Sequence, residues 1–295
     1  MTDRNILEGV VVLHETLHEI HTKKLYGVVF KVDFEKAYDK VKWPFLQQAL
    51  RMKGFHPAWR NQINSLTQKG SVGIKVNDDV GHYFQTHKGL RQGDSMSPLL
   101  FLIVIDPLQQ LLNSATWIGL LHKIRGCGTI IRTSLYADDA TVFVAPIRED
   151  IRNLADILEG FGEVTGLCTN FQKSSVVPIR CSHLPLEHIL SSIPATRAAF
   201  PIKYLGLPLS VRQLRKVDFQ YLEDKAAGKL VTWEGQSITT IGRTTLVRSV
   251  ITSQTVFSIT SLIVPQGTLH NINKIERAFL WSGSDKTTGA KCKVN

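Results

Sequence analysis

The chain has 295 residues, 43 % of them hydrophobic and 20 % charged, with a formal net charge of +10 at pH 7. This balance predicts a soluble globular protein of one large or two modest domains and excludes a disordered or fibrous chain. The four cysteines are scattered, which argues against a disulfide scaffold or a complete zinc site and predicts an intracellular protein. No apolar run approaches the roughly 18 residues of a membrane span, and the first residues lack a signal-peptide pattern.

The first predicted elements mix helices and strands without a regular βαβ repeat. Apolar residues at helical spacing predict a helix over 5–23, and the β-branched run YGVVFKVDF predicts a strand over 26–34. Prolines at first-turn positions predict helices over 44–52 and 57–68. Two alternating runs predict a hairpin over 71–85.

A glycine-containing loop then leads into the second half of the predicted elements. These are an apolar helix that Pro107 can kink, a second hairpin over 129–144, a helix over 149–165, a strand over 169–178, a short strand pair or turn at IKYLGLPLS, and helices over 216–230, 242–253 and 269–281. The fold class is therefore α+β: an antiparallel sheet with helices on one face over 1–200, then a mainly helical domain over 201–295. From residue 202 onward thirteen basic residues face six acidic ones, a balance that suits an anionic partner such as nucleic acid.

Two acidic residues, Asp138 and Asp139, stand side by side inside the apolar run SLYADDATVFVAP. A buried carboxylate is costly unless it is paired. If Asp33, at the end of the 26–34 strand, is a neighbour in the same sheet, three carboxylates converge, and divalent cations would neutralise them. On the Asp pair alone, a solvent-facing β-turn is the simpler explanation.

Five blocks of the sequence decide between these alternatives. They are VVFKVDFEKAYDKVKW, GLRQGDSMSPLLF, YADDA, GLCTNFQKSS and YLGLPL. In order and approximate spacing they resemble the reverse transcriptase of LINE-type (non-LTR) retrotransposons, plant members in particular. The resemblance implies a polymerase palm with partial fingers over 1–200, and a primer-grip hairpin with a helical thumb over 201–295. It implies an RNA-directed DNA polymerase that adds nucleotides to a primer 3′-hydroxyl by a two-metal mechanism.

The resemblance also implies roles for individual residues. The implied metal ligands are Asp33, Asp138 and Asp139, for two Mg²⁺ ions or Mn²⁺ in their place. Lys173 would assist the leaving pyrophosphate, and Tyr38 would act as a steric gate against a ribose 2′-hydroxyl. The residues implied at the incoming nucleotide are Phe34, Tyr38, Gln92 and Gly93, and those implied in the primer grip are Tyr204, Leu205 and Gly206. The implied partners are an RNA template, a DNA primer and dNTPs, with no membrane; the implied compartment is the nucleus, and the oligomeric state is left open.

Both ends of the chain depart from the family pattern. The sequence begins at RNILEGV, after the fingers blocks, and GAKCKVN resembles the start of the family's Cys/His-rich tail. We therefore expect a chain truncated at both ends, and the alternative function is an inert remnant that at most binds nucleic acid. A further alternative is zinc hydrolysis, because HETLH (14–18) matches H-E-x-x-H; its third ligand would be Glu35 or His21.

Overall fold

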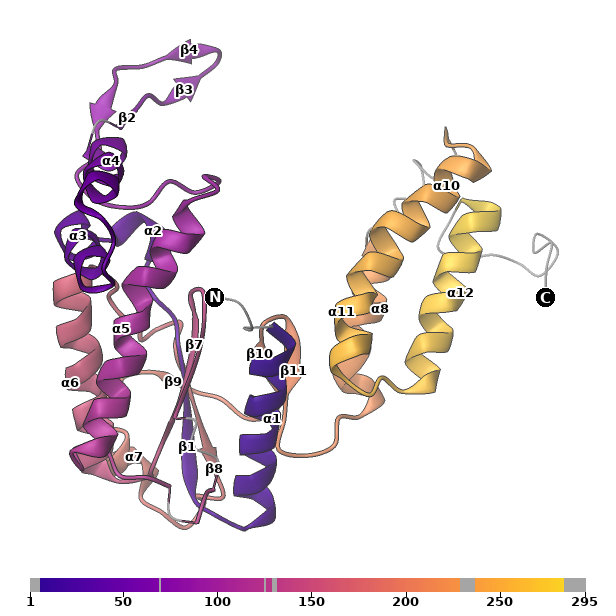
Figure 1. Cartoon of the computed structure of the whole chain (residues 1–295). Coiled ribbons are helices and arrows are strands. Elements are labelled where there is room, and N and C mark those ends of the chain that lie inside the picture. Colours follow the sequence, from indigo (N-terminus) through magenta and orange to yellow (C-terminus); the bar gives the residue numbers. More distant parts are fainter. Residues whose placement is uncertain (1–5, 69, 125, 129–131, 229–236, 284–295) are drawn as a thin grey trace. The chain divides into compact units, whose positions relative to one another are not determined.

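A computed structural model describes residues 6–68, 70–124, 126–128, 132–228 and 237–283 (Figure 1). The chain divides into two compact units: Glu15–Ala199 form one, and Met1–His14 together with Phe200–Asn295 form the other. The palm and thumb assignments of the two predicted domains remain predictions. The GAKCKVN segment, predicted to begin a Cys/His-rich tail, lies outside the described residues.

The Glu15–Ala199 unit is built on a five-stranded sheet in the order β6-β7-β1-β8-β9. Its strands are β1 (Gly27–Val32), β6 (Thr133–Tyr136), β7 (Asp139–Val144), β8 (Ser175–Ile179) and β9 (Thr196–Arg197). All neighbouring strands are antiparallel except β8 and β9. The predicted antiparallel sheet is confirmed, and β1 lies at its centre because its GVVFKV sequence can be buried on both faces.

Helices α3 (Trp43–Met52), α5 (Ser97–Trp117) and α6 (Arg148–Thr165) cover one face of this sheet (Figure 1). Alternate strand residues such as Phe30 and Val142 belong to the same buried core as Phe101 and Leu154 from these helices. Helix α4 (Pro57–Gln68) packs against α3, while α2 (Ala37–Lys40) and α7 (Leu186–Ile189) are single turns. The C-terminal half of α1 (Ile6–Thr22) lies against the other face, so helices are not confined to one side.

Helix α5 is long and apolar enough to cross a membrane by length and composition alone, which the sequence reading had excluded. It reaches that length because Pro107 lies inside the helix without ending it. Its side chains Phe101, Val104, Leu108 and Leu112 are fully buried in the sheet-and-helix core. These are the features of a core helix.

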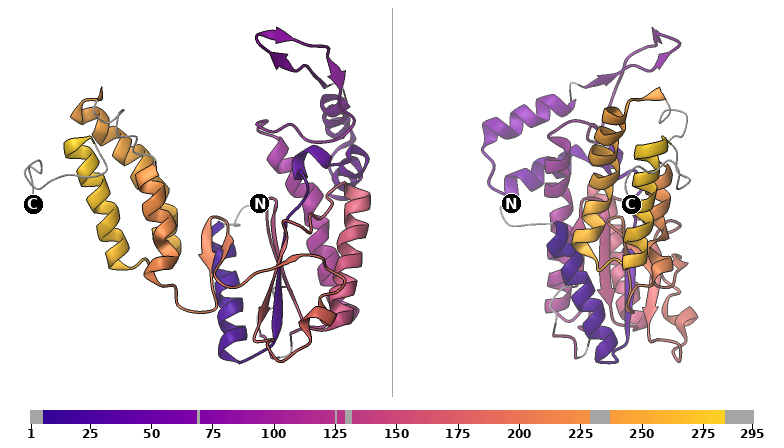
Figure 2. Two further views of the ribbon diagram at one scale, coloured as in Figure 1. Left: turned by 180° about the vertical axis from the view of Figure 1, so that it is seen from behind. Right: turned by 90° about the vertical axis from the view of Figure 1, so that its right-hand side faces the viewer.

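Between α4 and α5 the chain forms a projecting two-part hairpin (Figures 1 and 2). Strand β2 (Ser71–Val72) pairs with β5 (Phe84–Gln85) at its base, and β3 (Lys75–Val76) pairs with β4 (Asp79–Val80) at its tip. Asn77 and Asp78 form the tip turn with φ of 48° and 69°, a backbone that suits these two residue types. The predicted hairpin over 71–85 is present, and we call residues 70–85 the projecting hairpin.

The second unit begins with the predicted strand pair, β10 (Ile202–Tyr204) and β11 (Leu207–Leu209). The helical elements after it are η1 (Lys216–Phe219), α8 (Gln220–Gly228), α10 (Thr240–Leu246), η2 (Val247–Thr252), α11 (Ser253–Ser261) and α12 (Gln266–Ser282). The helix predicted over 242–253 is longer, because η2 continues α10 into α11 without a break. Phe219, Leu222 and Ile272 share one of its small buried clusters.

Candidate active site

The sheet register brings two of the three predicted acidic residues to the same end of the sheet. Strands β1 and β7 pair so that Val32 faces Ala140, and Asp33 directly follows Val32 while Asp139 directly precedes Ala140. In the β6–β7 hairpin, Tyr136 faces Asp139, so Ala137 and Asp138 form a two-residue turn. Ala137 has a φ of 50°, a strained conformation for a residue with a Cβ atom. Asp33, Asp138 and Asp139 therefore lie at one end of the central strands.

The backbone of Asp33 is fixed by the segment that precedes β8. Its N–H donates to Ser174 Oγ (3.0 Å), and its carbonyl accepts from the N–H of Asn170 (2.7 Å). Ser174 Oγ in turn donates to the carbonyl of Asn170 (2.7 Å). These contacts explain why the strand predicted over 169–178 begins only at Ser175: the preceding residues fold into a turn that holds Asp33 in place.

The carboxylates themselves do not form a closed cage. Asp139 is paired with Lys31, whose Nζ lies 3.4 Å from Oδ1 of the acid, and Asp138 is exposed. Among the residues that the structure describes, no three His, Cys, Asp or Glu side chains lie close enough together to hold a metal ion. Carboxylate oxygens nevertheless fit Mg²⁺, which is commonly bound by one or two carboxylates together with waters and substrate phosphates.

Tyr38 lies beside the hairpin turn with its ring held rigidly. The ring stacks on Phe101, with centroids 4.7 Å apart and planes 15° from parallel. Burial, together with the nearby charge of Asp138, raises the pKa of the Tyr38 hydroxyl. The backbone carbonyl of Tyr38 accepts from the N–H of Leu90 (2.7 Å), which ties the α2 segment to the glycine-containing loop.

The glycine-containing loop approaches this segment so closely that one position excludes any side chain. Gly89 has a φ of 93°, and a Cβ atom there would lie 2.6 Å from the backbone oxygen of Asp39. Gln92 Nε2 donates to Asp39 Oδ1 (3.2 Å), whereas Gly93 faces open space. Gln92 and Gly93 are both exposed, so they are available to a ligand.

A cavity of about 340 Å³ opens directly after Asp33. Its lining residues are Phe34, Glu35, Lys36, Lys40, Asn170 and Lys173. The cavity therefore gathers three lysines, of which the sequence reasoning had singled out only Lys173. Lys40 forms an ion pair with Glu35, which lowers the pKa of that carboxyl and raises the pKa of the lysine. The i, i+4 spacing of Lys36 and Lys40 within DFEKAYDK is the signal that could have found them.

The residues predicted for the primer grip lie in the other unit. Leu205 and Gly206 form the two-residue turn between β10 and β11, with φ of 48° and 82°. The Tyr204 side chain is only 1 % exposed, so its ring belongs to the interior of that unit. The surface that this hairpin offers therefore includes the exposed Lys203 and the partly exposed Leu205-Gly206 turn.

The zinc-hydrolase alternative finds no third ligand. His14 is half-buried and its Nε2 has no hydrogen-bond partner among the described residues. His18 is exposed and lies 3.4 Å from the hydroxyl of Thr22. No three potential ligands are grouped in the described part of the chain, and Glu35 is paired with Lys40.

Comparisons with known proteins identify the family of the chain. Residues 2–209 match the family described as reverse transcriptase (RNA-dependent DNA polymerase). The chain is 25 % identical over 290 residues to the Transposon TX1 uncharacterized 149 kDa protein of Xenopus laevis, covering 95 % of this chain and 21 % of that protein. It is 26 % identical over 196 residues to the retrovirus-related Pol polyprotein from type-2 retrotransposable element R2DM of Drosophila melanogaster, covering 63 % of this chain and 18 % of that protein. The chain thus spans about a fifth of the length of these relatives.

Among solved structures, telomerase from Candida albicans, in complex with a fragment of telomeric RNA, aligns with a TM-score of 0.48 and 13 % identity. That alignment covers 97 % of this chain and 48 % of the telomerase chain. The family match extends over more than half of the sequence and includes all three predicted acidic residues. This chain belongs to the reverse transcriptase (RNA-dependent DNA polymerase) family.

Proposed function

We propose that this chain is the RNA-directed DNA polymerase domain of a LINE-type (non-LTR) retrotransposon, acting in the nucleus on an RNA template, a DNA primer and dNTPs. The observation that supports the proposal is the β1–β7 register, in which Val32 faces Ala140, so that the neighbouring residues Asp33 and Asp139 and the turn that bears Asp138 are at one end of the sheet. The retrotransposon proteins among its relatives support the assignment.

In this proposal Asp33 and Asp138 hold the Mg²⁺ or Mn²⁺ ions, and Asp139 completes the acidic set. The bound ions would neutralise charge on the attacking 3′-oxygen and on the departing phosphate. Lys31 pairs with Asp139, which leaves the carboxylates of Asp33 and Asp138 to take the main share of the coordination. Because its backbone is fixed by hydrogen bonds, Asp33 would hold its carboxylate, and any bound ion, in a constant position relative to the primer 3′-end.

The residues around the acidic set would bind the nucleotide. Lys173, Lys36 and Lys40 surround the cavity after Asp33 and would neutralise the triphosphate and the leaving pyrophosphate. Phe34 lines the same cavity. The Tyr38 ring, fixed by its stacking on Phe101, would crowd a ribose 2′-hydroxyl and so favour deoxynucleotides.

Three further contacts complete the proposed complex. Gln92 and Gly93 would lie beside the incoming nucleotide, since both are exposed in the loop that Asp39 holds. The Leu205-Gly206 turn after Tyr204 would support the primer, and the helices of the second unit would bind phosphates along the template–primer duplex.

Mg²⁺-dependent dTMP incorporation on poly(rA)/oligo(dT) tests this proposal. Replacing Asp138 by Asn should lower the rate by about 10³-fold or more, because losing a metal ligand forfeits several kcal/mol of transition-state stabilisation. Asp156→Asn, an exposed acid on α6, is the matched control and should leave the rate unchanged. Hybrid binding without incorporation in either the wild type or the variants would support the inert remnant instead.

A further inference from the structure

The projecting hairpin exposes more apolar surface than its small size requires. Ile74, Tyr83 and Phe84 are 61 %, 70 % and 49 % exposed, and Val76 and Val80 at the tip are similarly open. The hairpin consists of two short two-stranded ladders, and Figures 1 and 2 show it extending away from the sheet and its helices. Clustered exposed apolar side chains of this kind mark interaction sites.

Tyr83 is supported by backbone on one side and open on the other. The ring lies over Gly73: a Cβ atom built on that glycine would be 3.1 Å from Cε1 of the tyrosine. The ring nevertheless stays 70 % exposed, so most of its surface faces solvent. A flat aromatic ring held in this way can stack on a nucleobase with little loss of side-chain entropy.

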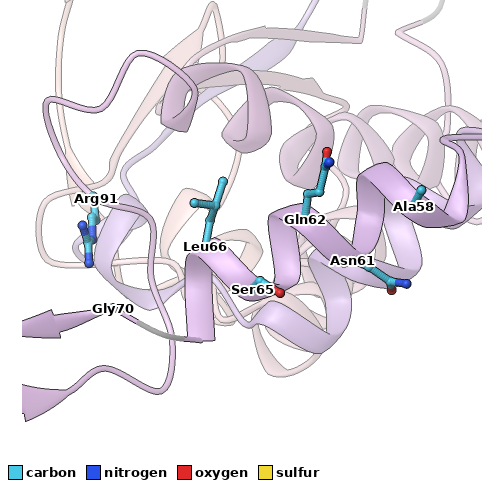
Figure 3. Close-up of a pocket in the computed structure, with 7 residues that line it drawn as sticks. All are labelled: Ala58, Asn61, Gln62, Ser65, Leu66, Gly70 and Arg91. Carbon is cyan, nitrogen blue, oxygen red and sulfur yellow. The ribbon is translucent and has the colours of Figure 1, made fainter.

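A cavity of about 750 Å³ adjoins the base of the hairpin, and several of its lining residues carry polar groups (Figure 3). It is lined by Ala58, Asn61, Gln62, Ser65, Leu66, Gly70 and Arg91, which come from α4, the start of the hairpin and the glycine-containing loop. The Arg91 guanidinium lies directly over Gly70, where a Cβ atom would be 2.5 Å from Nη2. Amides, a hydroxyl and a guanidinium are donors suited to phosphate and ribose oxygens.

The charges between the second half of the hairpin and the glycine-containing loop favour a polyanion. From Val80 to Gly93 the chain carries Lys88, Arg91 and two histidines but no acidic residue, while Asp78 and Asp79 lie at the hairpin tip, where Asp78 pairs with Lys75 (2.7 Å). The next acid, Asp94, accepts from the backbone N–H of Met96 (3.1 Å). Arg91 itself is exposed, so its guanidinium is available to a ligand. The same loop continues into Gln92 and Gly93 of the candidate active site.

We propose that the projecting hairpin and this cavity bind an unpaired RNA strand, with Tyr83 and Phe84 stacking on bases and Lys88 and Arg91 contacting phosphates. Asn61, Gln62 and Ser65 would donate to phosphate or 2′-hydroxyl oxygens. We identify this strand as the template before it pairs in the active site, and this identification rests on the proposed polymerase function. The binding of an unpaired RNA strand by itself does not depend on that function. Aromatic rings followed by cations, as in Tyr83, Phe84, Lys88 and Arg91, suit a single strand, whose bases are free to stack.

Fluorescence anisotropy of the full chain, with a labelled unpaired RNA 12-mer and a blunt RNA–DNA hybrid of equal length, tests the inference. Tyr83→Ala should weaken binding of the unpaired RNA by about 5- to 30-fold, since one base would lose its stacking partner, and should leave the blunt hybrid unchanged. Tyr83→Phe keeps the ring and should bind as the wild type does. Tyr26→Ala is the matched control. Tyr26 is half-exposed and precedes the start of β1, whereas Asp33 follows the end of that strand.

The cation contacts have a separate signature in the salt dependence. Arg91→Ala should reduce the slope of log Kobs against log salt for the unpaired RNA by about 0.7, the value for one lost phosphate contact on a single strand. Tyr83→Ala should weaken binding without changing that slope, because stacking releases no counterions. Arg152→Ala, an exposed arginine on α6, should change neither quantity.

Two results would overturn the inference. One is equal binding of the unpaired RNA by the wild type, Tyr83→Ala and Phe84→Ala. The other is a concentration-dependent dimer in sedimentation velocity that Tyr83→Ala abolishes while RNA binding stays intact, which would make the hairpin a self-association surface. The two proposals can fail separately. If the wild type incorporates no nucleotide but its RNA binding depends on Tyr83, only the proposed polymerase function is refuted. If the wild type incorporates nucleotides but its RNA binding does not depend on Tyr83, only this inference is refuted.

Discussion

Several residues near the candidate active site adopt backbone conformations with positive φ. Ala137 in the hairpin turn and Lys36 after Asp33 have φ of 50° and 44°, and Gly89 and Gly93 in the loop have 93° and 86°. For the two residues with a Cβ atom this conformation costs roughly 1–2 kcal/mol each. Surrounding contacts therefore hold them in place, and strain of this kind is concentrated at functional sites.

A single histidine outside the site should make stability depend on pH. Burial lowers the pKa of His14, so the folded protein resists protonation there more than the unfolded chain does. This contribution to stability is present above the ordinary histidine pKa of about 6.5 and is lost as the pH falls toward the lowered folded value. Between about pH 7.5 and about pH 5.5, Tm should therefore fall further in the wild type than in His14→Gln.

The exposed His21 at the end of the same helix is the control for this measurement. His21→Gln should lose Tm in parallel with the wild type over that pH range. If Tm falls by the same amount in His14→Gln as in the wild type, His14 does not contribute to the pH dependence of stability.

At the scale of the elements, a buried polar junction joins α6 to the β6–β7 edge of the sheet. Asp150, in the first turn of α6, is fully buried and accepts from the backbone N–H of His122 (2.9 Å). It also lies 2.7 Å from His122 Nδ1. Arg132, just before β6, donates to the carbonyl of Phe143 (3.2 Å) and to that of His122. Burial lowers the pKa of Arg132, and the Asp150 charge partly offsets this effect.

Asp150→Asn should therefore destabilise the protein by about 2–4 kcal/mol, because the substitution removes the charge that faces the buried Arg132 guanidinium and disrupts the contacts to His122. Urea unfolding followed by circular dichroism measures this change. Asp156→Asn on the exposed side of the same helix should stay within about 0.5 kcal/mol of the wild type. Equal stability of the two variants would show that the junction contributes nothing.

At the scale of the whole molecule, charge is distributed unevenly along the chain. Thirteen basic and six acidic residues from position 202 onward supply +7 of the net +10. Such an excess binds phosphates without reading sequence, because it releases condensed counterions. Lys274 and Arg277 on α12 are exposed members of this set.

For a blunt RNA–DNA hybrid, the logarithm of the binding constant Kobs should therefore fall linearly with the logarithm of the salt concentration between about 50 and 200 mM. The double variant Lys274→Gln/Arg277→Gln should reduce the slope by about 1 for each phosphate contact that it removes. Arg152→Gln on α6 is the charge-matched control, and a double variant with the control's slope would exclude α12 from the nucleic-acid surface.

The sequence by itself determined the local elements and the residues worth examining. Proline placement predicted the start of α4 at Pro57, a β-branched apolar run predicted β1, and two alternating runs predicted the projecting hairpin. Helical periodicity, strand alternation and turn chemistry depend on neighbours within a few residues, so they can be read from the chain alone. The five family blocks pointed to the acidic residues for the same reason, since each block is itself local.

Only the tertiary structure decided how these residues are combined. The position of Asp33 and Asp139 at one end of the sheet depends on a register between strands more than 100 residues apart, and so does the pairing of Lys31 with Asp139. The cavity with three lysines needs the turn before β8 to fold back onto Asp33, which also shortened the predicted strand. Register, cavities and exposure follow from how distant segments pack, and no local pattern encodes that packing.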